Sequence, residues 1–154
     1  MNAKIRHTHH EDASALSDLC FRSKAHWGYS LEFMENCREE LTVSREFLQL
    51  NPAFILMNDQ KIVGFYALEE IDKETVELSY LFVEPAHIGK GYGRKLLLHA
   101  KIKAKSLSYK LMVIQGDPNA EAFYRAIGAV TVGEKESISI PGRMLPLLNL
   151  ELDW

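Results

Sequence analysis

Apolar residues in the first part of the chain recur at intervals of three and four residues, the period of an amphipathic helix. One run predicts a helix that reaches about Ala25, and a second predicts a helix that begins after a capping Ser30. Their apolar positions are Ala13, Leu16, Leu19, Cys20, Leu31, Phe33, Met34, Cys37 and Leu41. Ahead of the first helix, residues 8–11 have the form of a capping box. In such a box, the Thr8 side chain accepts the amide of residue 11, and the Glu11 side chain reaches back to the Thr8 amide.

Short apolar runs between polar turns predict the strands. Residues 4–7 form a first strand, 54–57 and 62–68 a hairpin, 75–83 and 110–114 two further strands, and 129–139 and 144–152 a closing pair. Helices are expected from about Gly91 to Lys105 and from Asp117 to Gly128, which ends the second one. This order predicts an α/β (α+β) protein, a hairpin-rich sheet with helices laid across it.

Composition and charge narrow the function. A chain of 154 residues is expected to be one domain, residues 1–154. Eighteen Lys and Arg against 21 Asp and Glu give a net charge of −3, which argues against a general nucleic-acid binder. No apolar run has the length of a membrane span or of a signal peptide, and two unpaired cysteines suit a reducing compartment. We therefore expect a cytoplasmic protein with no nucleic-acid and no membrane partner.

Three alternating glycines follow the strand at 75–83: Gly89, Gly91 and Gly93. Loop amides and the start of the following helix make a site for an anion such as a pyrophosphate. Three basic residues add positive charge there: Lys90, Arg94 and Lys95. Neither the GxxxxGK[ST] phosphate loop nor the GxGxxG dinucleotide fingerprint matches this spacing. A tight turn without any ligand remains the alternative.

The segment from Val83 to Leu98 resembles the GCN5-related N-acetyltransferase (GNAT) family. Val-x-Pro precedes the three glycines, and the acyl-CoA signature Gln/Arg-x-x-Gly-x-Gly/Ala falls on residues 88–93, with Ile88 in place of Gln or Arg. Residues 117–129 resemble a second family segment, with Ala129 where the family usually has Phe. The resemblance implies a mixed, mostly antiparallel central sheet flanked by helices, with an acyl-CoA groove between splayed strands. It also implies acetyl-CoA-dependent transfer of an acetyl group to a primary amine by direct attack.

The resemblance implies how the cofactor is held. The strand end at 81–83 would pair with the pantetheine amides, loop amides at 88–93 would take the pyrophosphate, and Asn119 would hydrogen-bond the pantetheine arm. The expected cofactor-binding residues are Leu81, Phe82, Val83, Ile88, Gly89, Lys90, Gly91, Tyr92, Gly93, Arg94, Asn119 and Tyr124.

Two catalytic roles follow from the same resemblance. Tyr124 is the expected general acid, because a phenol near its ordinary pKa can hand a proton to a departing thiolate. Glu77 is the expected general base, and His26 is its rival because an imidazole pKa suits deprotonation of an ammonium. Strand alternation places Glu77 on the face of Leu81 and Val83 unless a bulge intervenes.

The acceptor side is expected at an aromatic connector and at the last turn. His26, Trp27 and Tyr29 would cradle a cationic amine or only pack between helices, and Arg143 would bind an acceptor carboxylate or be a turn residue. The acceptor is a small-molecule amine or a peptide amine, no metal is expected, and the chain is a monomer or a homodimer. The alternative function is a non-catalytic acyl-CoA-binding regulator or partner subunit of the same fold; a nucleotide-phosphate binder is disfavoured by the glycine spacing.

Overall fold

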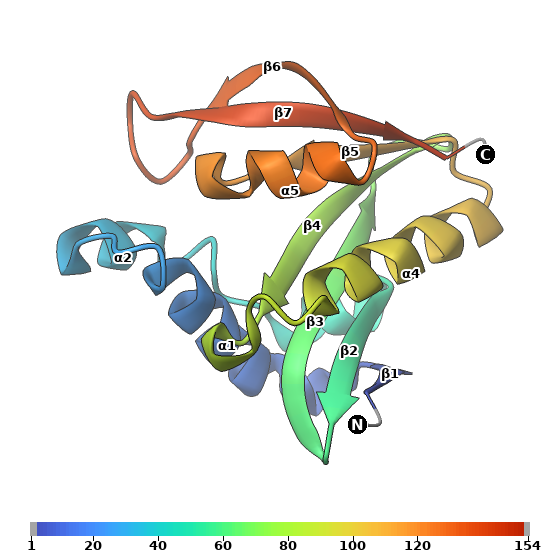
Figure 1. Cartoon of the computed structure of the whole chain (residues 1–154), viewed down its shortest axis with the longest axis horizontal. Helices are drawn as coiled ribbons and strands as arrows, with labels where there is room; N and C mark the ends of the chain where they lie inside the picture. The colour runs from blue at the N-terminus through green and yellow to red at the C-terminus, as the bar shows by residue number, and fades with distance from the viewer. Residues whose placement is uncertain (1–2, 153–154) are drawn as a thin grey trace.

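The computed structural model describes residues 3–152, whose strands form one sheet in the order β1-β2-β3-β4-β5-β7-β6 (Figure 1). The strands are β1 (Lys4–His7), β2 (Ala53–Asn58), β3 (Lys61–Glu70), β4 (Thr75–Val83), β5 (Leu111–Gln115), β6 (Val130–Glu136) and β7 (Met144–Glu151). β4 and β5 pair in parallel, and the other neighbouring strands pair antiparallel. The expected mixed, mostly antiparallel sheet is therefore confirmed.

Helices cover both faces of the sheet. The α-helices are α1 (Ala13–Ala25), α2 (Leu31–Cys37), α3 (Arg45–Leu50), α4 (Tyr92–Ser106) and α5 (Glu121–Ala126). Three short 3-10 turns each lie between a strand and the next α-helix: η1 (His10–Asp12), η2 (Pro85–His87) and η3 (Pro118–Ala120). In Figure 1, α4 crosses the sheet on one side, and α1 and α2 lie on the other. The strand 75–83 and the first helix's end at Ala25 agree with the sequence prediction.

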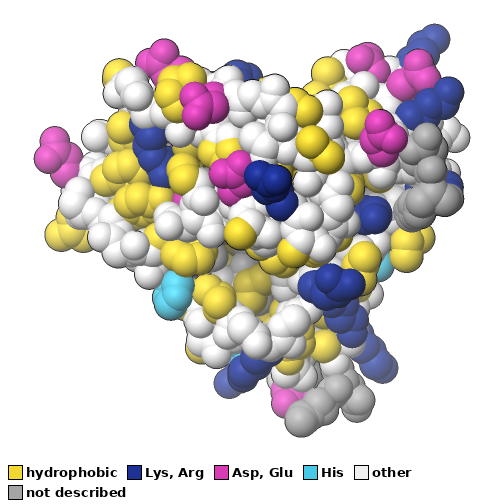
Figure 2. Space-filling model, turned by 45° about the horizontal axis from the view of Figure 1, so that its top comes forward, with side chains coloured by type: hydrophobic (Ala, Val, Ile, Leu, Met, Phe, Trp, Pro, Cys, Tyr) yellow, Lys and Arg dark blue, Asp and Glu magenta, His cyan; other side chains and the backbone are white. Residues whose placement is uncertain are grey.

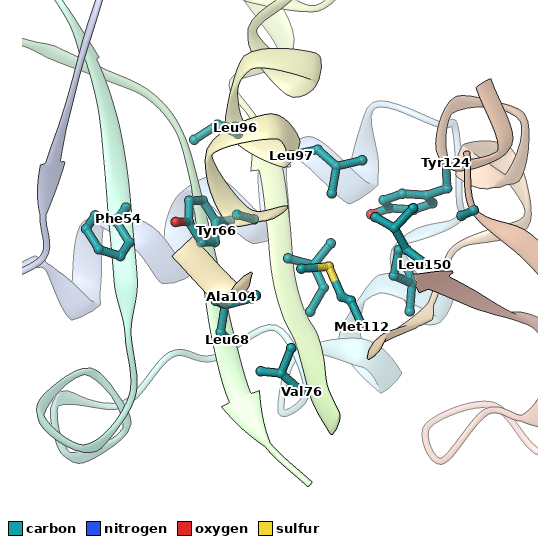
Figure 3. Close-up of a cluster of buried hydrophobic side chains, with 14 of the residues drawn as sticks. Phe54, Tyr66, Leu68, Val76, Leu96, Leu97, Ala104, Met112, Tyr124 and Leu150 are labelled. Atoms are coloured by element: carbon teal, nitrogen blue, oxygen red, sulfur yellow. The ribbon is translucent and has the colours of Figure 1, made fainter. Parts of the chain in front are cut away.

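The sheet separates two apolar cores. On one face, Leu96, Leu97 and Ala104 of α4 pack over β3, β4 and β5, with Tyr124 and Leu150 beside them (Figure 3). On the other face, α1, α2 and α3 pack on β2 and β3. Because both faces of β3 are covered, residues 63–68 are buried without interruption. Each fully buried large apolar side chain contributes about 1.5–3 kcal/mol to folding.

Two predictions about local structure are wrong, and one helix was missed. The cap ahead of α1 lies one residue later than expected: Asp12, not Glu11, accepts the His9 amide at 2.8 Å, because Asp12 is also held by Arg6 of β1 at 3.1 Å. The second helix ends at Cys37 rather than near 41, because the chain turns so that the Val43 amide can donate to Ser17 Oγ of α1. Helix α3, which this turn leads into, was not expected.

A β-bulge changes which face Glu77 occupies. Ala67 pairs with Tyr80 and Leu68 with Leu78, so Ser79 is the extra residue of β4. Val76, Leu78, Leu81 and Val83 therefore all pack on the α4 side, whereas Tyr80 and Phe82 pack on the α1 side. Glu77 thus shares its face with Tyr80 and Phe82, and simple alternation fails at the bulge.

The contact between the buried Tyr66 and the half-buried His99 makes stability depend on pH. Tyr66 Oη lies 2.7 Å from His99 Nδ1, between β3 and α4. Burial, with the nearby Lys103 and His7, lowers the pKa of His99 below its ordinary value. Because the unfolded chain then binds this proton more readily, the contribution is complete above about pH 6.5 and is lost as pH falls below it.

We expect His99→Gln to reduce the loss of stability that the wild type shows when urea unfolding is measured from pH 7.5 down to pH 5.5. His26→Gln, at the exposed end of α1, is the matched control and keeps the wild-type dependence. An equal reduction in both variants would contradict a special role for the Tyr66–His99 pair.

Candidate functional site

The two central strands part after a short stretch of pairing. Residues 75–77 of β4 pair with residues 111–113 of β5, after which β4 continues along β3 and β5 along β7 (Figure 1). A cavity of about 630 Å³ opens where they diverge, lined by β4, the 84–91 loop, the start of α4, the 116–120 loop, α5 and the end of α1. The expected groove between splayed strands is present.

The glycine loop forms one wall of this cavity. Gly89 and Gly91 have φ of 88° and 84°, in the left-handed region that favours glycine, and a Cβ at either would meet nothing within 4 Å. Gly91 precedes the first residue of α4. At Gly93, a Cβ would lie 3.3 Å from the Phe123 ring, so glycine lets α4 and α5 approach closely. Open space beside a helix N-terminus is suited to an anion.

The basic residues near the loop differ in placement. Arg94 and Ile88 line the cavity. Lys90 lies outside the lining, with its Nζ 3.4 Å from His87 Nδ1, and Lys95 donates to the Ala3 carbonyl at 2.9 Å. On the face drawn in Figure 2, Lys and Arg side chains stand in separate patches among acidic ones. Arg94 is thus the basic side chain of the three that faces the cavity.

Tyr124 lines the cavity from α5 and lies against Gly116, the residue that follows β5. Its side chain is buried, packs with Leu150, and lies so close to Gly116 that a Cβ there would be 3.2 Å from the ring. Burial, and secondarily the charge of Asp117, raise the pKa of Tyr124 above its ordinary value. The phenol is therefore protonated at neutral pH.

Glu77 lines the same cavity from β4 and is half-buried. It stands directly across from Glu69 of β3. Burial and then the Glu69 charge raise the pKa of Glu77, while Lys135 opposes the shift. A carboxylate with a raised pKa holds a proton more readily than an ordinary one, which suits a proton acceptor.

Five polar residues from four separate segments meet at Asp117; we call them the Asp117 cluster. Tyr29 Oη donates to Asp117 at 2.9–3.0 Å, Lys24 Nζ lies 3.2 Å from Asp117 Oδ2, and Asn119 Nδ2 donates to Asp117 Oδ1 at 2.9 Å. Arg143 donates to Tyr29 Oη at 2.7 Å. Burial would raise the pKa of Asp117, but the Asn119 amide and the Lys24 charge hold it below its ordinary value.

The structure brings most of the sequence-predicted site residues to one cavity. Those in its lining are Trp27, Glu77, Leu81, Phe82, Val83, Ile88, Gly89, Gly91, Tyr92, Gly93, Arg94, Asn119 and Tyr124. Those outside its lining are His26, Tyr29, Lys90 and Arg143. His26 is exposed at the end of α1.

Sequence reasoning missed three charged residues of the lining: Lys24, Glu40 and Asp117. Of these three, Asp117 alone had a local sequence signal, because an aspartate before a proline is typical of a helix cap. The structure shows this cap: the Asp117 side chain accepts the Asn119 backbone amide at 2.9 Å.

Residues 3–152 hold neither a candidate metal site nor a helix that could span a membrane. Within that range, no group of three or more His, Cys, Asp or Glu side chains is arranged to hold a metal ion. In the same part of the chain, every helix is too short or too polar to cross a membrane.

Known proteins resemble the chain over nearly its whole length. The model of the "Acetyltransferase (GNAT) family" matches residues 17–129. The peptidyl-lysine N-acetyltransferase YjaB of Salmonella typhimurium is 31% identical over 155 residues, which cover 97% of this chain and 98% of that protein.

Solved structures share the fold. The PaiA N-acetyltransferase of Thermoplasma acidophilum in complex with coenzyme A superposes with a TM-score of 0.79 at 23% identity, over 98% of this chain and 99% of that one. YncA of Salmonella typhimurium, a putative acetyltransferase with its cofactor acetyl-CoA, superposes with a TM-score of 0.73 at 23% identity. That match covers 100% of this chain and 96% of YncA.

Gly91→Ala is expected to destabilise the protein by about 1–3 kcal/mol, because a non-glycine residue is strained at this φ even with open space around its Cβ. Gly133→Ala is the matched control, since a Cβ there also meets nothing within 4 Å but no left-handed φ is required. Urea unfolding of the two variants measures the difference. Equal losses of stability would show that the left-handed backbone at Gly91 carries no strain.

Proposed function

The chain belongs to the GNAT acetyltransferase family and is an acetyltransferase, and from this premise we propose that it transfers the acetyl group of acetyl-CoA to the side-chain amine of a peptide lysine. The observation that carries the proposal is the unpaired edge of β4 beyond Glu77, which lies in a cavity that continues from the glycine loop to Tyr124. We propose residues 1–154 as one acetyltransferase domain.

The donor set of the cavity fits acetyl-CoA. Residues 81–83 have backbone N–H and C=O groups on an edge that β5 leaves unpaired, and the amides of a pantetheine arm complement such an edge. The open loop at 88–93 and the start of α4 suit the pyrophosphate, with Arg94 beside it. When bound, acetyl-CoA supplies the acetyl thioester. The solved structures with coenzyme A and acetyl-CoA support this assignment by their fold.

Asn119 has a defined hydrogen-bonding capacity toward this cofactor. Its Nδ2 carries two hydrogens, and these are used on Tyr29 Oη and Asp117 Oδ1, both at 2.9 Å. The group that Asn119 offers to a ligand is therefore its carbonyl oxygen. We propose that this oxygen accepts an N–H of the pantetheine arm.

We assign the two proton transfers to Glu77 and Tyr124. Glu77 removes a proton from the acceptor ammonium, directly or through water, and the free amine attacks the thioester carbonyl carbon. The new C–N bond forms as the C–S bond breaks, and Tyr124 donates its phenolic proton to the departing sulfur. The attacking nitrogen loses its second proton as it becomes the amide, and a proton returned through solvent restores the Tyr124 phenol. The raised pKa of Glu77 supports its role as the base, and the place of the protonated Tyr124 phenol in the lining of the same cavity supports its role as the acid.

The acceptor end of the cavity supports a cationic, protein-borne amine. Glu40 and Glu77 place carboxylates in the lining, and Trp27 and Ile138 expose apolar surface there. An ammonium is attracted to carboxylates and aromatic faces, and apolar surface suits the chain around a lysine. The relative from Salmonella typhimurium is named a peptidyl-lysine N-acetyltransferase, which supports the same acceptor class.

The assay that tests the function measures thiol release from acetyl-CoA with lysine peptides as acceptors, beside direct binding of acetyl-CoA. We expect turnover with the free lysine peptide and none with the same peptide already acetylated on its lysine. Binding of acetyl-CoA without turnover on any amine would instead identify a non-catalytic regulator.

Tyr124→Phe is expected to lower kcat about a hundredfold while leaving acetyl-CoA affinity unchanged, because it removes the proton donor and keeps the packed ring. Tyr92→Phe is the matched control: Tyr92 also lines the cavity, and its hydroxyl bonds Asn58 at 3.1 Å. Steady-state kinetics and calorimetric binding give the two readouts. Unchanged kcat in Tyr124→Phe would remove it from the acid role.

Glu77→Gln is expected to abolish the rise of kcat/KM with pH that reports a deprotonated base and to lower the plateau about a hundredfold. Since the Glu69 charge raises the pKa of Glu77, Glu69→Gln moves that rise to lower pH without abolishing it. His26→Ala tests the rival base in the same pH–rate series. Loss of the rise in His26→Ala alone would transfer the role to His26.

A further inference from the structure

The Asp117 cluster is saturated with hydrogen bonds at its centre. A phenol has one hydrogen to donate and two lone pairs. Tyr29 Oη donates to Asp117 and accepts from Asn119 Nδ2 at 2.9 Å and from Arg143 Nη2 at 2.7 Å, so its capacity is fully used. Such saturation fixes the hydroxyl position and with it the segments that meet there.

Aromatic rings hold the two cations of the cluster. The rings of Tyr29 and Phe33 stack at 4.2 Å, with 17° between their planes. The Arg143 guanidinium lies 4.9 Å from the Phe33 centroid, and Lys24 Nζ lies 5.6 Å from that of Tyr29. The charged side chains of Lys24, Asp117 and Arg143 are only 11%, 14% and 17% exposed. The ion pairs of Asp117 with Lys24 and Arg143 are thus shielded from water, unlike ion pairs on an open surface.

The cluster joins segments that are far apart in the sequence and lie around the acceptor end of the cavity. Lys24 belongs to α1, Tyr29 to the connector before α2, Asp117 to the loop before α5, and Arg143 to the loop between β6 and β7. Residues close to these in sequence line the cavity: Trp27 near Tyr29, and Leu145 near Arg143. Tyr29 and Arg143, outside the lining, thus support walls that their neighbours form.

The same carboxylate is tied to the element that carries Tyr124. Asp117 accepts the Asn119 backbone amide at 2.9 Å through its side chain, and its carbonyl accepts the Ala120 amide at 2.8 Å. These bonds begin the turn that leads directly into α5. A shift of Asp117 therefore moves both the acceptor walls and the start of the helix of Tyr124.

We propose that Asp117 is a positioning residue that, through Tyr29 and Arg143, fixes the acceptor walls relative to the helix of Tyr124 and so sets how the acceptor amine is held. This inference rests on the proposed acetyl transfer. Asp117 acts through its partners and takes no part in the proton transfers.

Two variants test the proposal at different severity. Asp117→Asn keeps the shape of the side chain but leaves Lys24 and Arg143 without their counter-charge. Tyr29→Phe removes only the hydroxyl and keeps the stack on Phe33, so it remains informative if Asp117→Asn fails to fold. Glu35→Gln is the matched control, because it removes a carboxylate from an exposed ion pair with Arg38 on α2.

The readouts are acetyl-CoA Kd, acceptor KM and kcat with a lysine peptide, and Tm. We expect Asp117→Asn and Tyr29→Phe to raise acceptor KM at least about tenfold, with kcat reduced less than KM is raised, because misplaced walls weaken acceptor placement. Acetyl-CoA Kd rises less than acceptor KM, because the strand edge and the glycine loop are untouched and Asn119 is the one proposed cofactor-binding residue in the cluster. Glu35→Gln leaves all of these values at those of the wild type.

Rescue separates positioning from bulk stability. Arg143→Lys keeps the charge and loses the planar fork, so its acceptor KM is expected between those of the wild type and Arg143→Met. The acceptor KM of the double variant, Asp117→Asn with Tyr29→Phe, is expected to be no higher than that of the more impaired single variant, because both substitutions break the same cluster.

The possible failures are distinguishable. A wild-type protein that transfers no acetyl group to any amine overturns the proposed function and this inference with it. An active wild type, with folded Tyr29→Phe and Asp117→Asn that keep the wild-type acceptor KM, overturns the inference alone. A lowered Tm with unchanged acceptor KM also overturns the inference, because that result would mean that the cluster only stabilises the fold.

Discussion

The separation of β4 from β5 is the constraint on which the rest of the structure depends. Pairing over residues 75–77 and 111–113 holds the two halves of the sheet together, and beyond it each strand keeps only its outer neighbour. The bulge at Ser79 lies two residues beyond the last paired residue of β4, where bending of a strand is expected. Backbone groups on the freed edge require partners from outside the sheet, which makes this edge a binding surface.

Close packing holds α5 at the cavity that opens between the two strands. Phe123 and Tyr124 of α5 line this cavity, and glycines permit their close approach: Gly93 faces Phe123, and Gly116 faces Tyr124. An added Cβ at these two glycines would lie within 3.2–3.3 Å of a ring, so a larger residue would push α5 outward. Well-packed contacts therefore fix α5 where it borders the cavity.

Local patterns explain what the sequence predicted well, and long-range contacts explain what it missed. The bounds of β4 follow from its apolar run and Glu84-Pro85, and the glycine loop from its spacing. The bulge at Ser79 depends on pairing with β3, and helix α3 on a turn fixed by Ser17 of α1. The contacts of Asp117 with Tyr29 and Arg143 span 88 and 26 residues, so no periodicity could indicate them.

The ionisable groups of the cavity are distinguished by their partners more than by their type. Burial raises the pKa of both Glu77 and Tyr124, and neighbouring carboxylates add to each shift. Asp117 is buried too, yet amide and ammonium partners lower its pKa. The two carboxylates of the cavity therefore suit different roles. Glu77 takes up a proton more readily than usual, which suits proton transfer. Asp117 is held charged, which suits fixing its cationic partners in place.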